Sequence, residues 1–256
     1  MRFTRARLTS FDDPQYRAYV QRMTMSRDNQ RATRPPRQRD LFGGEAEALL
    51  RAWLTEQGLV LSERRILEYE ERRDRNSIRK YRELDALVET GRSLQVFEVK
   101  ASRTARAIGR ARGQLLEIRG ALKLIAPQVT PVILLVDTGI PTPAEVAELM
   151  RAPDAPPVPP LTLDDVFAAD AKVVRVASLA AINPADERIP VLCFSLADIV
   201  AMAGDQPLHL DWEADEDDEP SPKGSPAAPP SVHTIGDDDS DEDDNPFAAL
   251  RGAFKE

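Results

Sequence analysis

Three charged residues in the middle of the chain have the types and the spacing that hydrolysis of a phosphodiester bond needs. In the segment 93–100, Glu98 and Lys100 are expected on one face, because side chains alternate along a β-strand. Asp85 lies thirteen residues before Glu98, in the otherwise apolar run 84–88. Buried carboxylates are costly unless they are paired or ligated, so two of them brought together by a hairpin indicate a cation between them. Carboxylate oxygens and water suit Mg²⁺, and we predict Mg²⁺ (or Mn²⁺) at this position.

The lysine fits the same chemistry. A metal would polarise a phosphoryl oxygen and lower the pKa of a bound water, while Lys100 would stabilise developing charge or orient the attacking water. Only six of the 34 basic residues are lysine, so this sequence uses arginine by default. A compact ammonium whose pKa can shift suits this role better than a guanidinium.

The elements around these residues indicate an α/β fold. Strands are predicted at 82–88 and 93–100, with a hairpin turn at 89–92. A helix from 43 that ends at Gly58 precedes them, and a basic amphipathic helix at 105–125, a buried strand at 129–136 and a helix at 142–150 follow. A second portion has a helix at 163–168, strands at 172–177 and 189–194, and a helix at 195–202 with Ser195 as N-cap. We expect it to extend the same sheet.

These residues resemble the PD-(D/E)XK nuclease superfamily, the restriction-endonuclease-like proteins, and among them the Holliday-junction-resolvase-like branches. The match consists of Leu84-Asp85, then Glu98-Val99-Lys100, after a helix that begins with Gly44-Glu45, and it covers about residues 43–137. The resemblance implies a mixed central sheet flanked by helices, with DNA as the substrate.

The resemblance also implies roles for single residues. Asp85, Glu98 and the Val99 carbonyl would be metal ligands, and Lys100 the catalytic lysine. A glutamate of the first helix lies near the metal in those branches and maps onto Glu45, with Glu47 as its neighbour. Some branches carry a catalytic glutamine in the helix after the motif, which maps onto Gln114. Many such nucleases cut two strands as a homodimer, and the sequence leaves the oligomeric state open.

Charge is segregated along the chain. Residues 1–40 hold ten arginines and four aspartates, whereas residues 211–244 hold fourteen acidic residues and one lysine. Residues 1–210 therefore carry a net charge of +3, and the acidic tail does not argue against DNA as a partner. We interpret 1–40 as a basic arm, which either contacts nucleic acid or is a disordered leader.

The remaining division follows composition. We predict a nuclease-like core at 41–152, an α/β extension at 153–204 and a disordered acidic linker at 205–244. Residues 245–256 form a short amphipathic motif in which Phe247, Leu250 and Phe254 would share a helical face. The tail either solvates the protein, covers the basic groove as a phosphate mimic, or docks this motif on a protein partner.

Several classes of protein are excluded. No apolar run approaches the roughly 20 residues that a membrane-spanning helix needs, and the N-terminus lacks the apolar core of a signal peptide. A single cysteine excludes an internal disulfide. We expect a cytoplasmic protein without a membrane partner.

Three functions are compatible with these patterns. The first is a metal-dependent endonuclease that acts on DNA in repair, recombination or defence against foreign DNA. The second is a catalytically inactive nuclease-fold module that binds DNA or protein, with the acidic tail as its working part. In the third, the chain is an interaction protein of an unrelated α/β fold, and the charged residues form ordinary ion pairs on a solvated sheet face.

Overall fold

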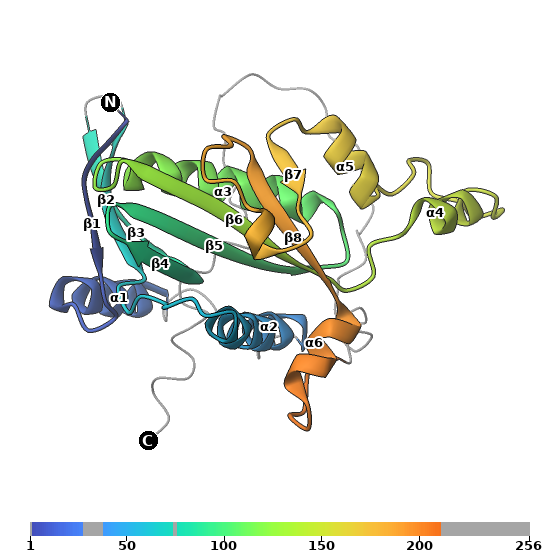
Figure 1. Cartoon of the computed structure of the whole chain (residues 1–256), viewed down its shortest axis with the longest axis horizontal. Helices are drawn as coiled ribbons and strands as arrows, with labels where there is room; N and C mark the ends of the chain where they lie inside the picture. Colours follow the sequence, from blue (N-terminus) through green and yellow to red (C-terminus); the bar gives the residue numbers. More distant parts are fainter. Residues whose placement is uncertain (1, 28–37, 74–75, 211–256) are drawn as a thin grey trace, which may run out of the picture.

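The computed structural model describes residues 2–27, 38–73 and 76–210, which form an α/β arrangement of two β-sheets flanked by helices (Figure 1). One sheet has the strand order β4-β5-β6-β8-β7, and the other has the order β1-β2-β3. The strands are β1 (Phe3–Thr9), β2 (Ile66–Arg73), β3 (Asn76–Glu83), β4 (Ala86–Thr90), β5 (Ser93–Ser102), β6 (Gln128–Asp137), β7 (Val173–Arg175) and β8 (Ile189–Ser195). The helices are α1 (Pro14–Arg27), α2 (Gln38–Glu56), α3 (Arg106–Leu122), α4 (Pro143–Leu149), α5 (Leu163–Ala169), α6 (Leu196–Ala203) and the short 3₁₀ turn η1 (Leu179–Ala181).

The five-stranded sheet is mixed. Strands β4 and β5 are antiparallel and turn at Gly91, whose φ of 59° lies in the region that favours glycine. Strand β6 is parallel to β5 and is reached through α3, as expected for a helical crossover. Strands β8 and β7 continue the same sheet in parallel, which confirms the prediction that the second portion extends it.

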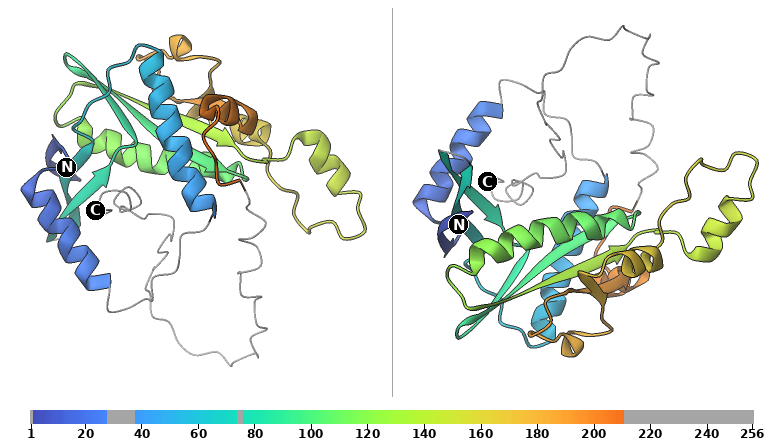
Figure 2. Two further views of the ribbon diagram at one scale, coloured as in Figure 1. Left: turned by 90° about the horizontal axis from the view of Figure 1, so that it is seen from below. Right: turned by 90° about the horizontal axis from the view of Figure 1, so that it is seen from above.

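Helices cover both faces of this sheet, and Figure 2 shows α2 and α3 on opposite sides of it. Helix α3 packs on the face that carries Leu87, Val96 and Ile133. Helix α2 packs on the face that carries Phe97 and Leu134. Each face therefore removes its own apolar layer from water, which is the main source of stability in such an arrangement.

Helix ends follow local sequence signals. Gly58, with a φ of 83°, follows the end of α2 as predicted. Ser195 caps α6 and forms a capping box with Asp198, which confirms the predicted N-cap.

The N-terminal segment contains a strand that we did not predict. Within the expected basic arm at 1–40, β1 pairs antiparallel with β2, and the helix α1 follows. The arginines of this segment bind glutamates of β2, in the pairs Arg2–Glu71, Arg5–Glu70 and Arg7–Glu68. Its described basic residues thus hold two strands together as well as carrying charge.

The predicted single strand at 82–88 is wrong, because it is divided between the two sheets. Strand β3 ends at Glu83 and β4 begins at Ala86, so Asp85 lies in the bend between them. The backbone carbonyls at this break are satisfied by arginine side chains. Arg65 donates to the carbonyls of Leu84 and Asp85, and Arg51 donates to that of Asp85 at 2.7 Å.

Other predictions lie outside the described residues. Residues 211–256 are among these, so most of the acidic linker at 205–244 and the motif with Phe247, Leu250 and Phe254 are not described. Among the helices that are described, none is both long and apolar enough to cross a membrane.

Candidate functional site

The bend between the two sheets fixes Asp85 beside strand β5. One carboxylate oxygen of Asp85, Oδ2, accepts a hydrogen bond from the backbone N–H of Val99 at 2.7 Å. The side chain thereby takes the place of the next strand residue, since the pairing of β4 with β5 ends at Ala86 and Phe97. Asp85 is consequently held at the edge of β5, next to the predicted Glu98-Val99-Lys100 segment.

Glu98 and Lys100 lie together on the face of β5 that α3 covers. Glu98 is 7% exposed, and its Oε1 lies 2.9 Å from the Nζ of the half-buried Lys100. Both alternate with Phe97 and Val99, which pack on the opposite face, as the sequence predicts. The structure therefore brings Asp85, Glu98 and Lys100 into one cluster.

The carboxylates of this cluster repel one another. The pKa of Asp85 is raised well above its ordinary value, first by burial and then by the negative charges of Glu98 and Glu47. The hydrogen bond from Val99 and the charge of Lys100 act in the opposite direction. Such mutual repulsion is what a bound cation relieves.

Helix α2 contributes one acid, Glu47, whose charge acts on Asp85 in the cluster. Burial raises the pKa of Glu47, and the charge of Glu98 raises it further, while Arg65 and Arg51 oppose the shift. The carboxylate of Glu45, by contrast, accepts a hydrogen bond from the backbone N–H of His209 at 2.9 Å and contacts its ring nitrogen Nδ1. The structure thus places Glu45 against the start of the C-terminal segment.

Three further charged residues surround the cluster, and no sequence pattern predicted them. Arg65 lies 3.4 Å from Glu47 and 3.5 Å from Glu83, and its guanidinium stacks over the ring of Phe11. The pKa of Glu83 is raised to about 7, chiefly by burial, although Arg65 opposes the shift. Burial and the charge of Arg65 lower the pKa of Arg51. The pairing of β2 with β3 brings Arg65 and Glu83 to the bend, and α2 brings Arg51 there, so no local motif reports this arrangement.

Gln114 lies in the middle of α3 and is half-buried. It follows Ala111 by one turn and precedes Ile118 by one turn, and both of these pack toward the sheet. Gln114 is therefore within the arc of α3 that covers the face carrying Glu98.

The donor set suits a hard cation that keeps part of its water shell. The described residues contain no group of three or more His, Cys, Asp or Glu arranged to hold a metal ion. They do offer two adjacent carboxylates, Asp85 and Glu98. The Val99 carbonyl points to the same strand edge as the Val99 N–H that binds Asp85, since both groups of a strand residue project to one side. Mg²⁺ is commonly held by one or two carboxylates together with water and substrate phosphates, so this set fits it.

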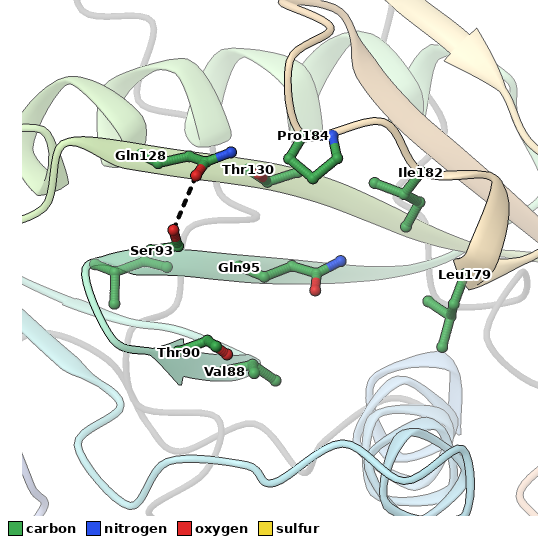
Figure 3. A pocket seen from close by; sticks show the side chains of 10 residues that line it. Val88, Thr90, Ser93, Gln95, Gln128, Thr130, Leu179, Ile182 and Pro184 are labelled. Carbon is green, nitrogen blue, oxygen red and sulfur yellow. Dashed lines mark hydrogen bonds between the residues drawn. The ribbon is translucent and has the colours of Figure 1, made fainter.

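A hollow lies at the other end of β5, away from the cluster (Figure 3). It has a volume of about 200 Å³ and lies between the sheet and the segment around η1. Its lining consists of Val88, Thr90, Ser93, Leu94, Gln95, Gln128, Thr130, Leu179, Ile182 and Pro184, with Ser93 hydrogen-bonded to Gln128. No charged side chain of the described residues lines it, so it offers no positive charge to a phosphate.

The chain matches no protein-family model and no curated protein sequence.

Proposed function

We propose that the protein is a Mg²⁺- or Mn²⁺-dependent nuclease that hydrolyses phosphodiester bonds of DNA with Asp85, Glu98 and Lys100. The observation that carries the proposal is the cluster itself. Asp85 is fixed by Val99 beside Glu98, where burial and then like charges raise its pKa, and a lysine stands 2.9 Å from Glu98. Two repelling carboxylates with an adjacent lysine form a set that metal-assisted hydrolysis uses.

The order of elements supports assignment to the restriction-endonuclease-like fold. Helix α2 precedes the β4–β5 hairpin, which carries the acids, and α3 and the parallel strand β6 follow. This is the order that the resemblance to PD-(D/E)XK nucleases implies. In this assignment Glu47 takes the place of the helix acid near the metal.

Each residue has a distinct task in the proposed reaction. Asp85, Glu98 and the Val99 carbonyl would hold the cation, which supplies Lewis-acid polarisation of the phosphoryl oxygen when it is bound. The ammonium of Lys100 has three hydrogens, so it can bond a phosphate oxygen as well as Glu98. Its positive charge would stabilise the charge that develops on that phosphate.

The surface next to the cluster suits a polyanion. Arg103, Arg106 and Arg110 are exposed and follow the end of β5 into the first turns of α3. They therefore extend positive charge away from Lys100. Binding to DNA through such residues should weaken steeply as salt rises.

One observation favours a second candidate, a module of this fold that binds nucleic acid without cutting it. The ion pair between Lys100 and Glu98 neutralises one of the two carboxylates on which a cation would depend. A chain that keeps this pair closed in the presence of Mg²⁺ would bind DNA and leave it intact.

Cleavage assays separate the two candidates. We would incubate supercoiled plasmid and single-stranded DNA with the full chain and with a chain that ends at Leu210, each in Mg²⁺, in Mn²⁺ and in EDTA. The nuclease proposal predicts cutting with either metal and none in EDTA. Salt-sensitive binding without cutting by either chain would establish the second candidate instead. Faster cutting by the shorter chain would assign an inhibitory role to the acidic tail.

A further inference from the structure

A hollow of about 350 Å³ lies outside the cluster, between α1 and β3. Its lining consists of Tyr19, Arg22 and Met23 from the helix and of Arg79 and Tyr81 from the strand. Among the described residues, the lining thus combines two aromatic rings and two cations and contains no acid. This composition complements a ligand that has both a flat ring and a phosphate.

The two rings offer a stacking surface that is fixed from behind. Tyr81 is only 6% exposed and packs against Tyr16, with ring centroids 5.6 Å apart. Tyr19 is partly exposed and lies over Tyr81 with a centroid separation of 4.6 Å and an angle of 36° between the ring planes. Because Tyr81 anchors it, Tyr19 would lose little freedom when a further ring stacks on it.

Both arginines are exposed and held through their Nε atoms. Arg22 donates to the carbonyl of Ala18 at 3.3 Å, and the Nε of Arg79 lies 3.3 Å from a carboxylate oxygen of Glu68. Glu68 is itself buried and also binds Arg7, so its charge is shared between two guanidinium groups. The hollow therefore presents a net positive charge to solvent.

The hollow is joined to the proposed catalytic cluster by packed residues. Tyr81 lies four residues before Asp85 along the chain. Phe11, which packs on Tyr16, lies against the guanidinium of Arg65, and that guanidinium donates to the carbonyl of Asp85. The end of β3 and the packed side chains of Phe11 and Arg65 thus connect the two features.

We propose that this hollow binds a base of a single-stranded nucleic acid, with the base stacked on Tyr19 and the neighbouring phosphates bound by Arg22 and Arg79. Stacking on an aromatic side chain beside cations is the common way in which proteins hold single strands without reading their sequence. The inference rests on the proposed function, because the bound strand would be the one that the cluster cuts.

The test measures binding of the full chain to an oligothymidylate that contains one 2-aminopurine, whose fluorescence falls when it stacks. EDTA is present so that no cutting occurs. Tyr19→Ala should weaken binding at least about tenfold and remove the quenching, since one stacked base is worth a factor of that order. Tyr19→Phe keeps the ring and should bind and quench like the unchanged protein. Arg17→Ala, on α1 but outside the lining, is the matched control for loss of a single charge and should bind similarly.

Thermal denaturation of each variant shows whether α1 still folds, because Tyr19 also packs on Tyr81. Should Tyr19→Ala prove unstable, Arg22→Ala replaces it and should lower affinity and salt dependence together. Equal affinity and equal quenching for folded Tyr19→Ala and the unchanged protein would overturn the inference. The inference would also be overturned if the protein bound a synthetic peptide of residues 237–256 in a manner that depends on Tyr19 and did not quench the 2-aminopurine of the oligonucleotide.

Failure of the proposed function gives a different result. If no cutting occurs under any condition while Tyr19-dependent quenching persists, the nuclease proposal fails and the stacking site stands. If cutting is metal-dependent and no quenching occurs, the stacking site fails alone.

Discussion

The carboxylate of Asp85 binds the backbone N–H of Val99 at 2.7 Å and so replaces a strand pairing at the point where β4 ends. One oxygen of Asp85 thus has a structural role, while its negative charge and that of Glu98 repel each other. The two roles can be separated by substitution, because an amide keeps the acceptor and removes the charge.

We expect Asp85→Asn to be at least as stable as the unchanged protein at pH 8 without metal, because the repulsion is removed and the Val99 N–H is still satisfied. Asp85→Ala should lose about 1–3 kcal/mol of the free energy of unfolding, the cost of leaving a buried donor unpaired. Urea denaturation measures both. An asparagine variant as unstable as the alanine variant would show that charge repulsion at Asp85 is unimportant.

The acids around the bend should make the metal-free protein more stable at pH 5 than at pH 7. The pKa of Glu83 is raised from 4.5 to about 7, so between these values the folded chain holds a proton that the unfolded chain has released. Stability then falls as pH rises through this window, and the raised pKa values of Asp85 and Glu47 act in the same direction. Thermal denaturation between pH 5 and 7 should show this slope.

Two variants test the origin of that slope. Glu83→Gln should reduce it, whereas Glu56→Gln, at an exposed position of α2, should leave it unchanged. An identical slope in all three proteins would contradict the assignment to Glu83.

A buried network of ion pairs connects the N-terminal segment to the hairpin of β2 and β3. Glu71, whose side chain is 2% exposed, binds Arg2 at 2.6 Å and Lys80 at 2.9 Å, and these partners help to lower its pKa to about 2 despite its burial. Glu71→Gln should therefore cost about 1.5–3 kcal/mol at pH 7, the range for hydrogen bonds to charged groups. This contribution should disappear as pH falls from about 4.5 toward 2, because the unfolded chain takes up its proton first.

Glu70 is the matched control, since it lies on the same strand and binds the well-exposed Arg5. Glu70→Gln should cost no more than about 1 kcal/mol, as surface ion pairs contribute little. Equal losses for the two variants in urea denaturation would contradict a special role for Glu71.

Helix α3 approaches β1 closely at Gly120. A Cβ atom there would lie 2.8 Å from the ring of Phe3, which is itself held edge-on against Tyr69. Gly120→Ala should destabilise the protein by about 1–2 kcal/mol, because the collision outweighs the gain in helix propensity. Gly113→Ala, on the same helix with no atom near the added Cβ, should be neutral or stabilising by up to about 1 kcal/mol. A loss of stability in Gly113→Ala equal to that in Gly120→Ala would contradict this packing argument.

The sequence alone predicted the elements that carry regular apolar patterns. The alternation in β5, the continuous apolar run of β6 and the helical period of α3 each reflect burial that local spacing reports. The relative placement of Glu98 and Lys100 followed from the same alternation.

The hairpin of β2 and β3 was not predictable in this way. Its inward positions include Glu68 and Glu71, which are buried only because arginines and a lysine from neighbouring strands neutralise them. A charged residue that is buried by tertiary pairing looks like a surface residue in the sequence. The same reason hid Arg65 and Glu83.

The choice between Glu45 and Glu47 also depends on tertiary structure. Both flank the buried Ala46 of α2, so the helical period treats them as equivalent. The path of α2 past the end of β4 brings the charge of Glu47 to bear on Asp85. Glu45 instead accepts a hydrogen bond from His209, near the end of the described chain.

The rate of Mg²⁺-dependent DNA cleavage by single-site variants tests the central proposal most directly. We would compare the unchanged protein with Asp85→Asn, Glu98→Gln and Lys100→Ala, and with Lys172→Ala as a control at an exposed lysine before β7. Each of the three cluster variants should lose at least about 100-fold in rate, because each removes a metal ligand or the charge that stabilises the reacting phosphate. The Lys172 variant should cut at the unchanged rate. Equal cutting by all five proteins would contradict the account, because the activity would then not arise from Asp85, Glu98 and Lys100.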